Sequence, residues 1–285
     1  MLGKLIKYEF RSTGPIFALM YAALLALAAV NSLLMSLGDS RPLDFGKQIG
    51  PTVYSIIASI TSFLYILVCA AVIIMTIVIV VMRFYRMFGN EGYLWHTLPV
   101  KADQHIIAKL LVSFVWAVAS CLALLISIGL LTIRTGWIFK LYRIGEIWNQ
   151  LVSYGFHPEL WLILLVVFLI ANWLSGILMF YAATAIGPNI IKSRLGGSVL
   201  AYIICYIGMQ IAGSVLLIAL MFPLRAQAEF IASNHWTLMN LAGVAQASEQ
   251  IMILTVGSFS LFSLVCAVVL YILTRYFMSR KLNLP

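Results

Sequence analysis

The residues able to bind a metal or to act in catalysis are few in this chain and widely spaced. Its cysteines, Cys69, Cys121, Cys205 and Cys266, each lie inside a long apolar stretch, with no CxxC pair and no histidine at ligand spacing. Such settings are typical of small packing residues and not of a metal site or a disulfide framework. The four histidines are scattered between the apolar stretches. We therefore expect no catalytic group, no metal and no bound cofactor in this chain.

Three motif classes are also missing from the sequence. No Asp, Glu, Lys or Arg lies well inside an apolar stretch, whereas ion-coupled carriers place a titratable group at mid-membrane. The stretches hold no paired carboxylates, HExxH or Ser/Lys arrangement of an intramembrane protease, and the chain has no G-x-x-x-x-G-K-[ST] phosphate loop. A transporter built on this chain would take its energy from another polypeptide.

Composition explains this scarcity. Hydrophobic residues make up 63% of the 285 residues and charged residues only 9%, against roughly 45–50% and about 25% in soluble domains. Six uncharged stretches each exceed the about 20 residues that a helix needs to cross a bilayer. Their continuous apolarity excludes barrel strands. The sequence predicts an all-α integral membrane protein with six transmembrane helices, at about residues 16–37, 53–82, 110–133, 160–187, 197–224 and 250–274.

Basic residues are shared unequally between the two sides of this topology. With the N-terminus inside, the cytoplasmic segments hold twelve Lys and Arg and three acidic residues, and the outer segments hold six of each. This pattern predicts a multi-pass membrane protein with both termini in the cytoplasm. The net charge of +9 then faces the anionic leaflet, so no nucleic-acid partner is needed. The first apolar stretch is too long for a signal peptide.

Residues 1–14 predict an amphipathic interfacial helix ahead of the first span. At 100° per residue, three basic residues share one side: Lys4, Lys7 and Arg11. Apolar residues share the other side: Leu2, Leu5, Ile6 and Phe10. Glu9 lies in the middle of the apolar side, where contact with lipid is costly for a charge. We expect Glu9 to face a protein partner that supplies Arg or Lys; a simple topology anchor is the alternative.

The segment from Arg83 to Leu111 is the longest cytoplasmic loop of this topology, and it is rich in aromatic residues. Gly89, Gly92 and Pro99 break any helix that continues from the second span. A short helix lying across the membrane surface fits between these breaks, and a passive connector is the alternative. On the outer side we expect an interfacial helix within 137–154 and a loop over 225–249. Gly187-Pro188-Asn189 predicts the end of the fourth span.

These cytoplasmic residues resemble the permease subunits of bacterial ABC transporters of the type-two exporter class. The resemblance covers a basic amphipathic start, six spans and a functional loop after the second span. In that family the loop often reads Glu, Gly-Thr, then Leu-Pro, then a basic residue that opens the third span. The counterparts here are Glu91-Gly92, Leu98-Pro99 and Lys109, and Tyr93 stands where Thr is common.

The resemblance implies a permease, not an enzyme, whose coupling helix between spans two and three seats in a separate ABC ATPase subunit. The residues implied in this coupling are Phe88, Glu91, Gly92, Tyr93, Leu94, Pro99 and Glu9. ATP and Mg²⁺ would bind to the ATPase, and a second permease chain, the same or related, would complete the pathway in the lipid bilayer, which the resemblance implies is the bacterial cytoplasmic membrane. A stand-alone channel or secondary carrier is the alternative, and a membrane enzyme or regulatory scaffold is a further one.

Overall fold

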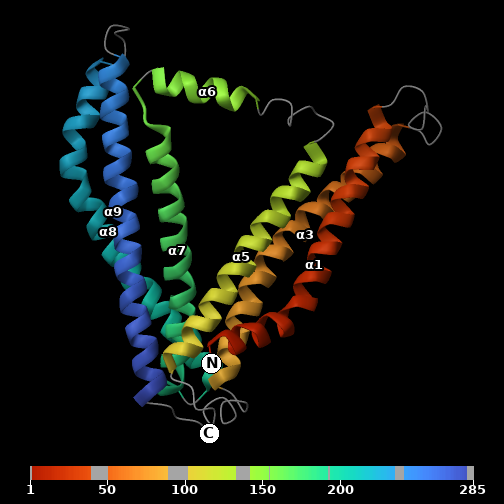
Figure 1. The fold of residues 1–285 in the computed structure, drawn as a ribbon, viewed down its shortest axis with the longest axis vertical. Coiled ribbons are helices and arrows are strands. Elements are labelled where there is room, and N and C mark those ends of the chain that lie inside the picture. Colours follow the sequence, from red (N-terminus) through yellow and green to blue (C-terminus); the bar gives the residue numbers. More distant parts are fainter. Residues whose placement is uncertain are drawn as a thin grey trace. The chain divides into compact units, whose positions relative to one another are not determined.

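A computed structural model describes residues 2–39, 51–88, 102–132, 142–153, 155–191, 193–234 and 241–280, and these residues are mainly helical (Figure 1). The elements are α1 (Leu2–Asp39), α3 (Pro51–Tyr85), η1 (Arg86–Phe88), α5 (Ala102–Thr132), α6 (Tyr142–Ser153), α7 (Pro158–Ile186), η3 (Gly187–Asn189), α8 (Arg194–Asn234) and α9 (Leu241–Arg280). Six of these helices are long and apolar enough to cross a membrane. The all-helical fold with six apolar spans is therefore confirmed.

Several helices run beyond the apolar stretches that predicted them. α5 begins at Ala102, ahead of Lys109, and so shortens the predicted loop after the second span. α8 continues through Pro223 to Asn234, and α9 already begins at Leu241. The loop expected over 225–249 is therefore wrong for most of its length. Charged residues end an apolar stretch without ending a helix, because straight-chain charged side chains have good helix propensity.

Two local predictions can be compared directly with the helices. α7 ends at Ile186, and the Gly-Pro-Asn sequence forms the 3₁₀ turn η3, so the predicted stop is confirmed. α6 lies within the predicted outer helix. Residues 2–14, by contrast, do not form a separate helix. They are continuous with the first span, since α1 runs from Leu2 to Asp39 with Pro15 in its interior. A proline removes one backbone hydrogen bond and bends a helix, and in Figure 1 the first turns of α1 run at an angle to the rest.

The chain divides into two compact units. Unit 1 comprises Met1–Arg83 and Asp103–Tyr142, and unit 2 comprises Phe84–Ala102 and Arg143–Pro285. In unit 1, α1, α3 and α5 share a core of Leu24, Ala28, Tyr65, Val72 and Ala123. In unit 2, α7, α8 and α9 pack against one another.

Unit 2 includes a very close backbone approach where α7 gives way to α8. A Cβ atom built on Gly197 would lie 2.1 Å from the carbonyl oxygen of Gly187. A Cβ atom on Gly187 would lie 2.4 Å from the backbone nitrogen of Ser198. Only glycine leaves room for backbones this close, so the two glycines set the packing of η3 against α8.

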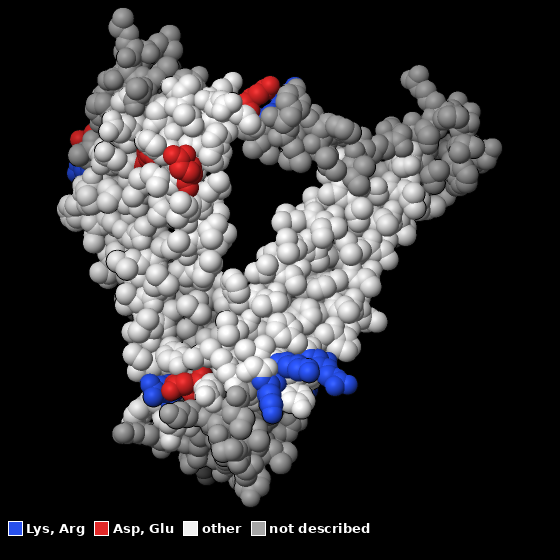
Figure 2. All heavy atoms as spheres, in the orientation of Figure 1, with Lys and Arg blue, Asp and Glu red and all other residues white. Residues whose placement is uncertain are grey.

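The outer faces of the helices are suited to hydrocarbon. Large apolar side chains such as Phe63 and Phe222 are exposed, at 68% and 80%. Figure 2 shows the charged side chains near the ends of the helices on this face, with an uncharged band between them. Since exposed apolar surface on this scale is unfavourable in water, it indicates that lipid surrounds these faces.

Candidate functional site

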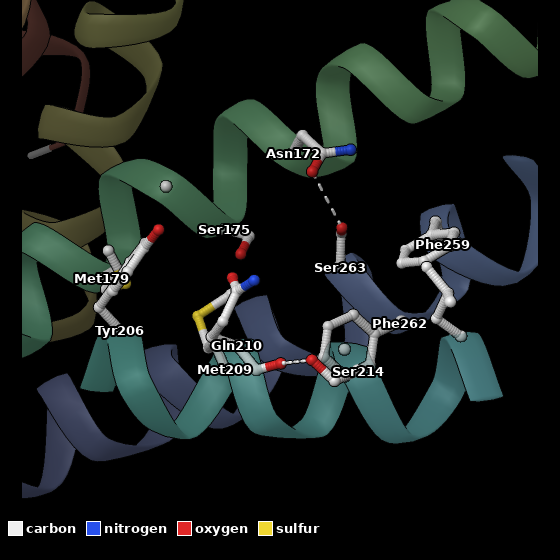
Figure 3. A pocket seen from close by; sticks show the side chains of 13 residues that line it. Asn172, Ser175, Met179, Tyr206, Met209, Gln210, Ser214, Phe259, Phe262 and Ser263 are labelled. Atoms are coloured by element: carbon white, nitrogen blue, oxygen red, sulfur yellow. Dashed lines mark hydrogen bonds between the residues drawn. The ribbon is translucent and has the colours of Figure 1, made fainter. Parts of the chain in front are cut away.

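A cavity of about 360 Å³ lies between α7, α8 and α9 of unit 2 (Figure 3). Polar side chains from all three helices line it: Asn172 and Ser175 from α7, Gln210 and Ser214 from α8, and Ser263 from α9. Its apolar wall consists of large side chains: Met179, Tyr206, Met209, Leu217, Phe259 and Phe262. The cavity combines hydrogen-bonding groups with thioether and ring surfaces, which is the usual character of a small-molecule site.

The polar groups of this cavity lie far from the ends of the helices. Asn172, Gln210 and Ser263 are each close to the midpoint of their apolar spans, Pro158–Asn189, Arg194–Arg225 and Gln246–Ser279. If these spans cross a bilayer, the cavity is at the depth of the hydrocarbon centre. Polar residues at that depth are costly, and they commonly mark a substrate or ion pathway.

The two amide side chains of the cavity, Asn172 and Gln210, differ in their hydrogen bonds. Asn172 donates from Nδ2 to the carbonyl oxygen of Phe168 at 2.9 Å and accepts from Ser263 Oγ at 3.2 Å. Asn172 therefore links α7 to α9. The Gln210 amide, in contrast, has no hydrogen-bonding partner among the described side chains and projects into the cavity (Figure 3).

The wall of the cavity is electrically neutral. Its lining residues are Asn, Gln, Ser, Gly, Met, Leu and aromatic residues, without Asp, Glu, Lys, Arg or His. Among the residues described by the structure, no group of three His, Cys, Asp or Glu is placed to hold a metal ion. The chemistry that this lining offers is reversible binding through neutral hydrogen bonds and apolar contact.

A second polar site, in unit 1, is built around Glu9. One carboxylate oxygen lies 2.6 Å from Arg83 Nη1, and the other lies 2.6 Å from Lys109 Nζ. Lys109 and Glu9 are buried, with side-chain exposures of 6% and 8%, whereas Arg83 is 24% exposed. Arg83 also donates to Ser12 Oγ, and Lys109 donates to the carbonyl oxygen of Arg83 at 3.3 Å. Glu9 therefore joins the end of α3 to the first part of α5.

The contacts of Glu9 correct the expectation about its partner. The carboxylate is neutralised by an Arg and a Lys, as its position on the apolar side of the helix suggested, but both belong to this chain. Neutral contacts continue the attachment of α1 to α5: Trp116 Nε1 donates to Thr13 Oγ1 at 2.9 Å, and the Trp116 ring stacks on Phe17 at 4.2 Å between centroids. The start of α1 is thus fixed within unit 1 by charge and by aromatic packing.

Most of the predicted coupling residues fall beyond the described part of the chain. Glu91, Gly92, Tyr93, Leu94 and Pro99 lie outside the described residues, and Phe88 is the last residue of η1. The residues that precede this segment, Phe84 to Phe88, are described by the structure, and two of them are buried. Phe84 is fully buried and stacks on Tyr181 of α7, with ring centroids 3.8 Å apart and an interplanar angle of 9°. Met87 is 1% exposed.

The cavity residues were not identified from the sequence, although one signal was available. Asn172 and Gln210 are amides inside apolar stretches, and buried or lipid-facing amides need a partner. That signal is incomplete, since Asn31 is also an amide in an apolar stretch and it packs in unit 1, where Ser62 Oγ donates to its Oδ1 at 3.4 Å.

No protein-family model, no curated protein and no solved structure matches this chain. The cavity and the Glu9 cluster therefore have to indicate the function by themselves.

Proposed function

We propose that this protein is the membrane-spanning subunit of an ATP-driven ABC exporter. Two such chains would form the translocation pathway, and a separate ATPase subunit would bind ATP and Mg²⁺. The observation that carries the proposal is the Gln210 amide, which has no hydrogen-bonding partner among the described side chains and lies in a neutral cavity at the middle of three apolar spans. Export of an amphipathic cargo fits a cavity that mixes amide, hydroxyl, thioether and ring surfaces.

The unpaired amide supports transport over a purely structural role. An amide without a hydrogen-bonding partner in an apolar medium costs roughly 2–7 kcal/mol. A residue kept only for packing would be more stable as an apolar side chain, or paired as Asn172 is. Water or the polar part of a cargo molecule would supply the missing hydrogen bonds of Gln210. A wet or ligand-filled cavity at this depth is the property that a translocation pathway needs.

The source of energy follows from the neutral lining and from the sequence. Ion-coupled carriers use a titratable or ion-binding group within the membrane, and this cavity offers neutral groups only. The chain has no phosphate loop of its own. An ATPase on a separate chain is therefore the energy source that we propose, as the resemblance around Glu91-Gly92 and Leu98-Pro99 implies.

Packing within unit 2 supports a mechanical route from the ATPase to the cavity. The segment that would contact the ATPase follows Phe84 and Met87, whose side chains are buried. Phe84 stacks on Tyr181, and α7 carries both Tyr181 and the cavity residues Asn172 and Ser175. Because α7 is a continuous helix, a push on Phe84 would reach the wall of the cavity through one rigid element.

Glu9 has a different part in this proposal from direct contact with the ATPase. Its two partners, Arg83 and Lys109, flank the coupling segment in the sequence, one before it and one after it. A single carboxylate therefore holds both ends of the segment at a fixed base. Because the two ends of the segment are held in place, a force applied to the segment would move the elements packed against it.

The proposal is tested by ATP turnover in reconstituted membranes. The protein is combined with an ABC ATPase that co-purifies with it from native membranes, and turnover is compared for Glu91→Ala, Tyr93→Ala and Asp103→Ala. A buried carboxylate–Arg pair broken on one side typically costs about 3–5 kcal/mol, and a solvated pair at most about 1 kcal/mol. We expect Glu91→Ala and Tyr93→Ala to lose stimulation of the ATPase, and Asp103→Ala to keep it.

Two outcomes would contradict this function. Cargo flux through the purified protein without any ATPase would make it a channel or a secondary carrier. Normal stimulation by both Glu91→Ala and Tyr93→Ala, with loss in Asp103→Ala, would place the coupling contact elsewhere in the loop. Co-purification of the two chains from native membranes is the simplest first measurement.

A further inference from the structure

A second cavity lies near the beginning of α7, between α6, α7 and α9. Figure 1 shows α6 beside the beginning of α7. The volume of the cavity is about 710 Å³, and every lining side chain is apolar or aromatic. Trp161, Leu165 and Phe168 line it from α7 at helical spacings of four and three residues. This cavity is separate in character from the polar one described above.

We infer that this apolar cavity binds one acyl chain of a bilayer glycerophospholipid. Its walls come from α6, from the first turns of α7 and from α9, and so it lies near one end of the membrane spans. The same part of α7 also carries exposed apolar side chains outside the lining, among them Ile163 and Leu169 at 60% and 57%. Since these faces are suited to lipid, hydrocarbon chains are the apolar molecules that meet the mouth of the cavity. The inference rests on the spans crossing a bilayer and not on transport.

An unpaired donor in the wall points to the chemistry of the occupant. The Trp161 indole Nε1 is buried and has no hydrogen-bonding partner among the described residues. Its ring meets Phe156 edge-on, with centroids 5.9 Å apart. A buried indole N–H normally finds an acceptor. The ester carbonyl at the head of an acyl chain is such an acceptor, and it lies at the depth where tryptophans gather in membrane proteins.

The rim of the cavity is polar, as a site for a lipid requires. Phe156 and Pro158 line the cavity, and His157 between them is 60% exposed. The backbone nitrogen of His157 lies 3.3 Å from Glu249 Oε1, and its Nδ1 lies 3.1 and 3.2 Å from the two oxygens of that carboxylate. An apolar interior beside a polar rim matches a molecule with a hydrocarbon chain and a polar head.

The test uses vesicles of phosphatidylethanolamine and phosphatidylglycerol that contain a small fraction of phosphatidylethanolamine with a diazirine at the end of one acyl chain. The full-length protein is reconstituted without ATPase or cargo and illuminated, and the labelled residues are mapped by mass spectrometry. We expect labels to concentrate on lining residues such as Leu165 and Val256. Labelling no stronger at these positions than at exposed apolar residues outside the cavity, such as Phe63, would overturn the inference.

Matched variants sharpen the result. Leu165→Trp fills the cavity and should remove the concentrated labelling, whereas Leu169→Trp, on the same helix but outside the lining, should leave it unchanged. Trp161→Phe keeps the ring and deletes the N–H, and it should lower the lipid retained through purification about two- to tenfold. Equal retention by Trp161→Phe, or labelling that appears only after an amphipathic cargo is added, would contradict a bilayer lipid as the occupant.

Discussion

Glu9 shows how a charge can be kept on the apolar side of a membrane-associated helix. An isolated carboxylate would be very costly there, but two cations lie at 2.6 Å from its two oxygens. Such a buried set adds little net stability over an apolar one, although removal of one member is strongly destabilising. The cluster is therefore best understood as a device that fixes the geometry of three helix ends.

The first prediction concerns the loss of this carboxylate. Glu9→Gln removes the carboxylate charge that lies 2.6 Å from the buried Lys109 ammonium, so the free energy of unfolding should fall by about 3–5 kcal/mol. The measurement is the temperature at which half of the detergent-solubilised protein leaves the folded monomer peak. Lys4→Gln, at an exposed position of the same helix, should change stability by no more than about 0.5 kcal/mol.

A double variant tests whether the stability lost in Glu9→Gln comes from the loss of charge pairing or from any substitution at this site. Glu9→Gln combined with Lys109→Met removes the buried ammonium as well and should recover a large part of the lost stability, because a buried pair can be replaced by apolar groups at little cost. A double variant that is less stable than Glu9→Gln would show that Lys109 has another buried role.

The second prediction concerns water at Gln210. In a background without native cysteines, Gln210→Cys should react with a small, charged thiol reagent at least about tenfold faster than Ile211→Cys, since only a thiolate reacts and a thiolate needs water. Ile211 is the next residue of α8, is 61% exposed and lies outside the lining of the polar cavity. Equal rates at the two positions would mean that the cavity is dry or that both positions face water.

Residue types in the sequence could not by themselves locate this cavity. Asn31, Asn172 and Gln210 are all amides in apolar stretches. Asn31 and Asn172 are hydrogen-bonded between helices, whereas Gln210 has no side-chain partner within the described part of the chain. Which situation applies depends on the rotation of each helix against its neighbours, and that is set by packing over the whole interface. For Glu9 the sequence predicted the need for a basic partner, because a charge on an apolar face demands an opposite charge, but it did not predict that Arg83 and Lys109 of the same chain supply it.

At the scale of elements, apolar length predicted the presence of the spans better than their ends. Lipid requires every backbone group to be paired within the element, so a long apolar stretch has to be a helix. Outside the hydrocarbon this requirement disappears, and helix ends depend on local propensity and on tertiary contacts. That is why α8 and α9 run past the charged residues Arg225 and Glu249, whereas Gly187-Pro188-Asn189 gave a reliable end.

The third prediction concerns the close approach of η3 and α8. Gly197→Ala would place a methyl group 2.1 Å from the Gly187 carbonyl oxygen, a backbone atom that cannot turn aside, so we expect a loss of about 1–3 kcal/mol or more from overpacking. Gly208→Ala on the same helix meets nothing within 4 Å and should stabilise α8 by up to about 1 kcal/mol through helix propensity. Thermal unfolding in detergent measures both. Equal stabilities of the two variants would show that the backbones of η3 and α8 can move apart at little cost.

At the scale of the whole molecule, the division of the chain into units is informative about coupling. The boundary falls between two consecutive residues, Arg83 in unit 1 and Phe84 in unit 2. Arg83 is fixed by Glu9, and Phe84 is fixed by Tyr181. The coupling segment that we propose thus begins at the peptide bond that joins the two units. Each unit holds its own residue at this bond, unit 1 through Glu9 and unit 2 through Tyr181.

The last prediction is the orientation of the whole chain in the membrane. Twelve of the eighteen Lys and Arg residues fall on one side of the six-span topology, and basic loops stay in the cytoplasm during insertion. In a background without native cysteines, single cysteines at Asn90 and Asn283 should react with an impermeant thiol reagent only from the cytoplasmic side, and those at Phe45, Gln150 and His235 only from outside. Gln150 is the critical position, because its loop carries the basic residues Arg134, Lys140 and Arg143. Labelling of Gln150 from the cytoplasm alone would move α6 to the inner side, and with it the membrane edge at which we place the acyl-chain cavity.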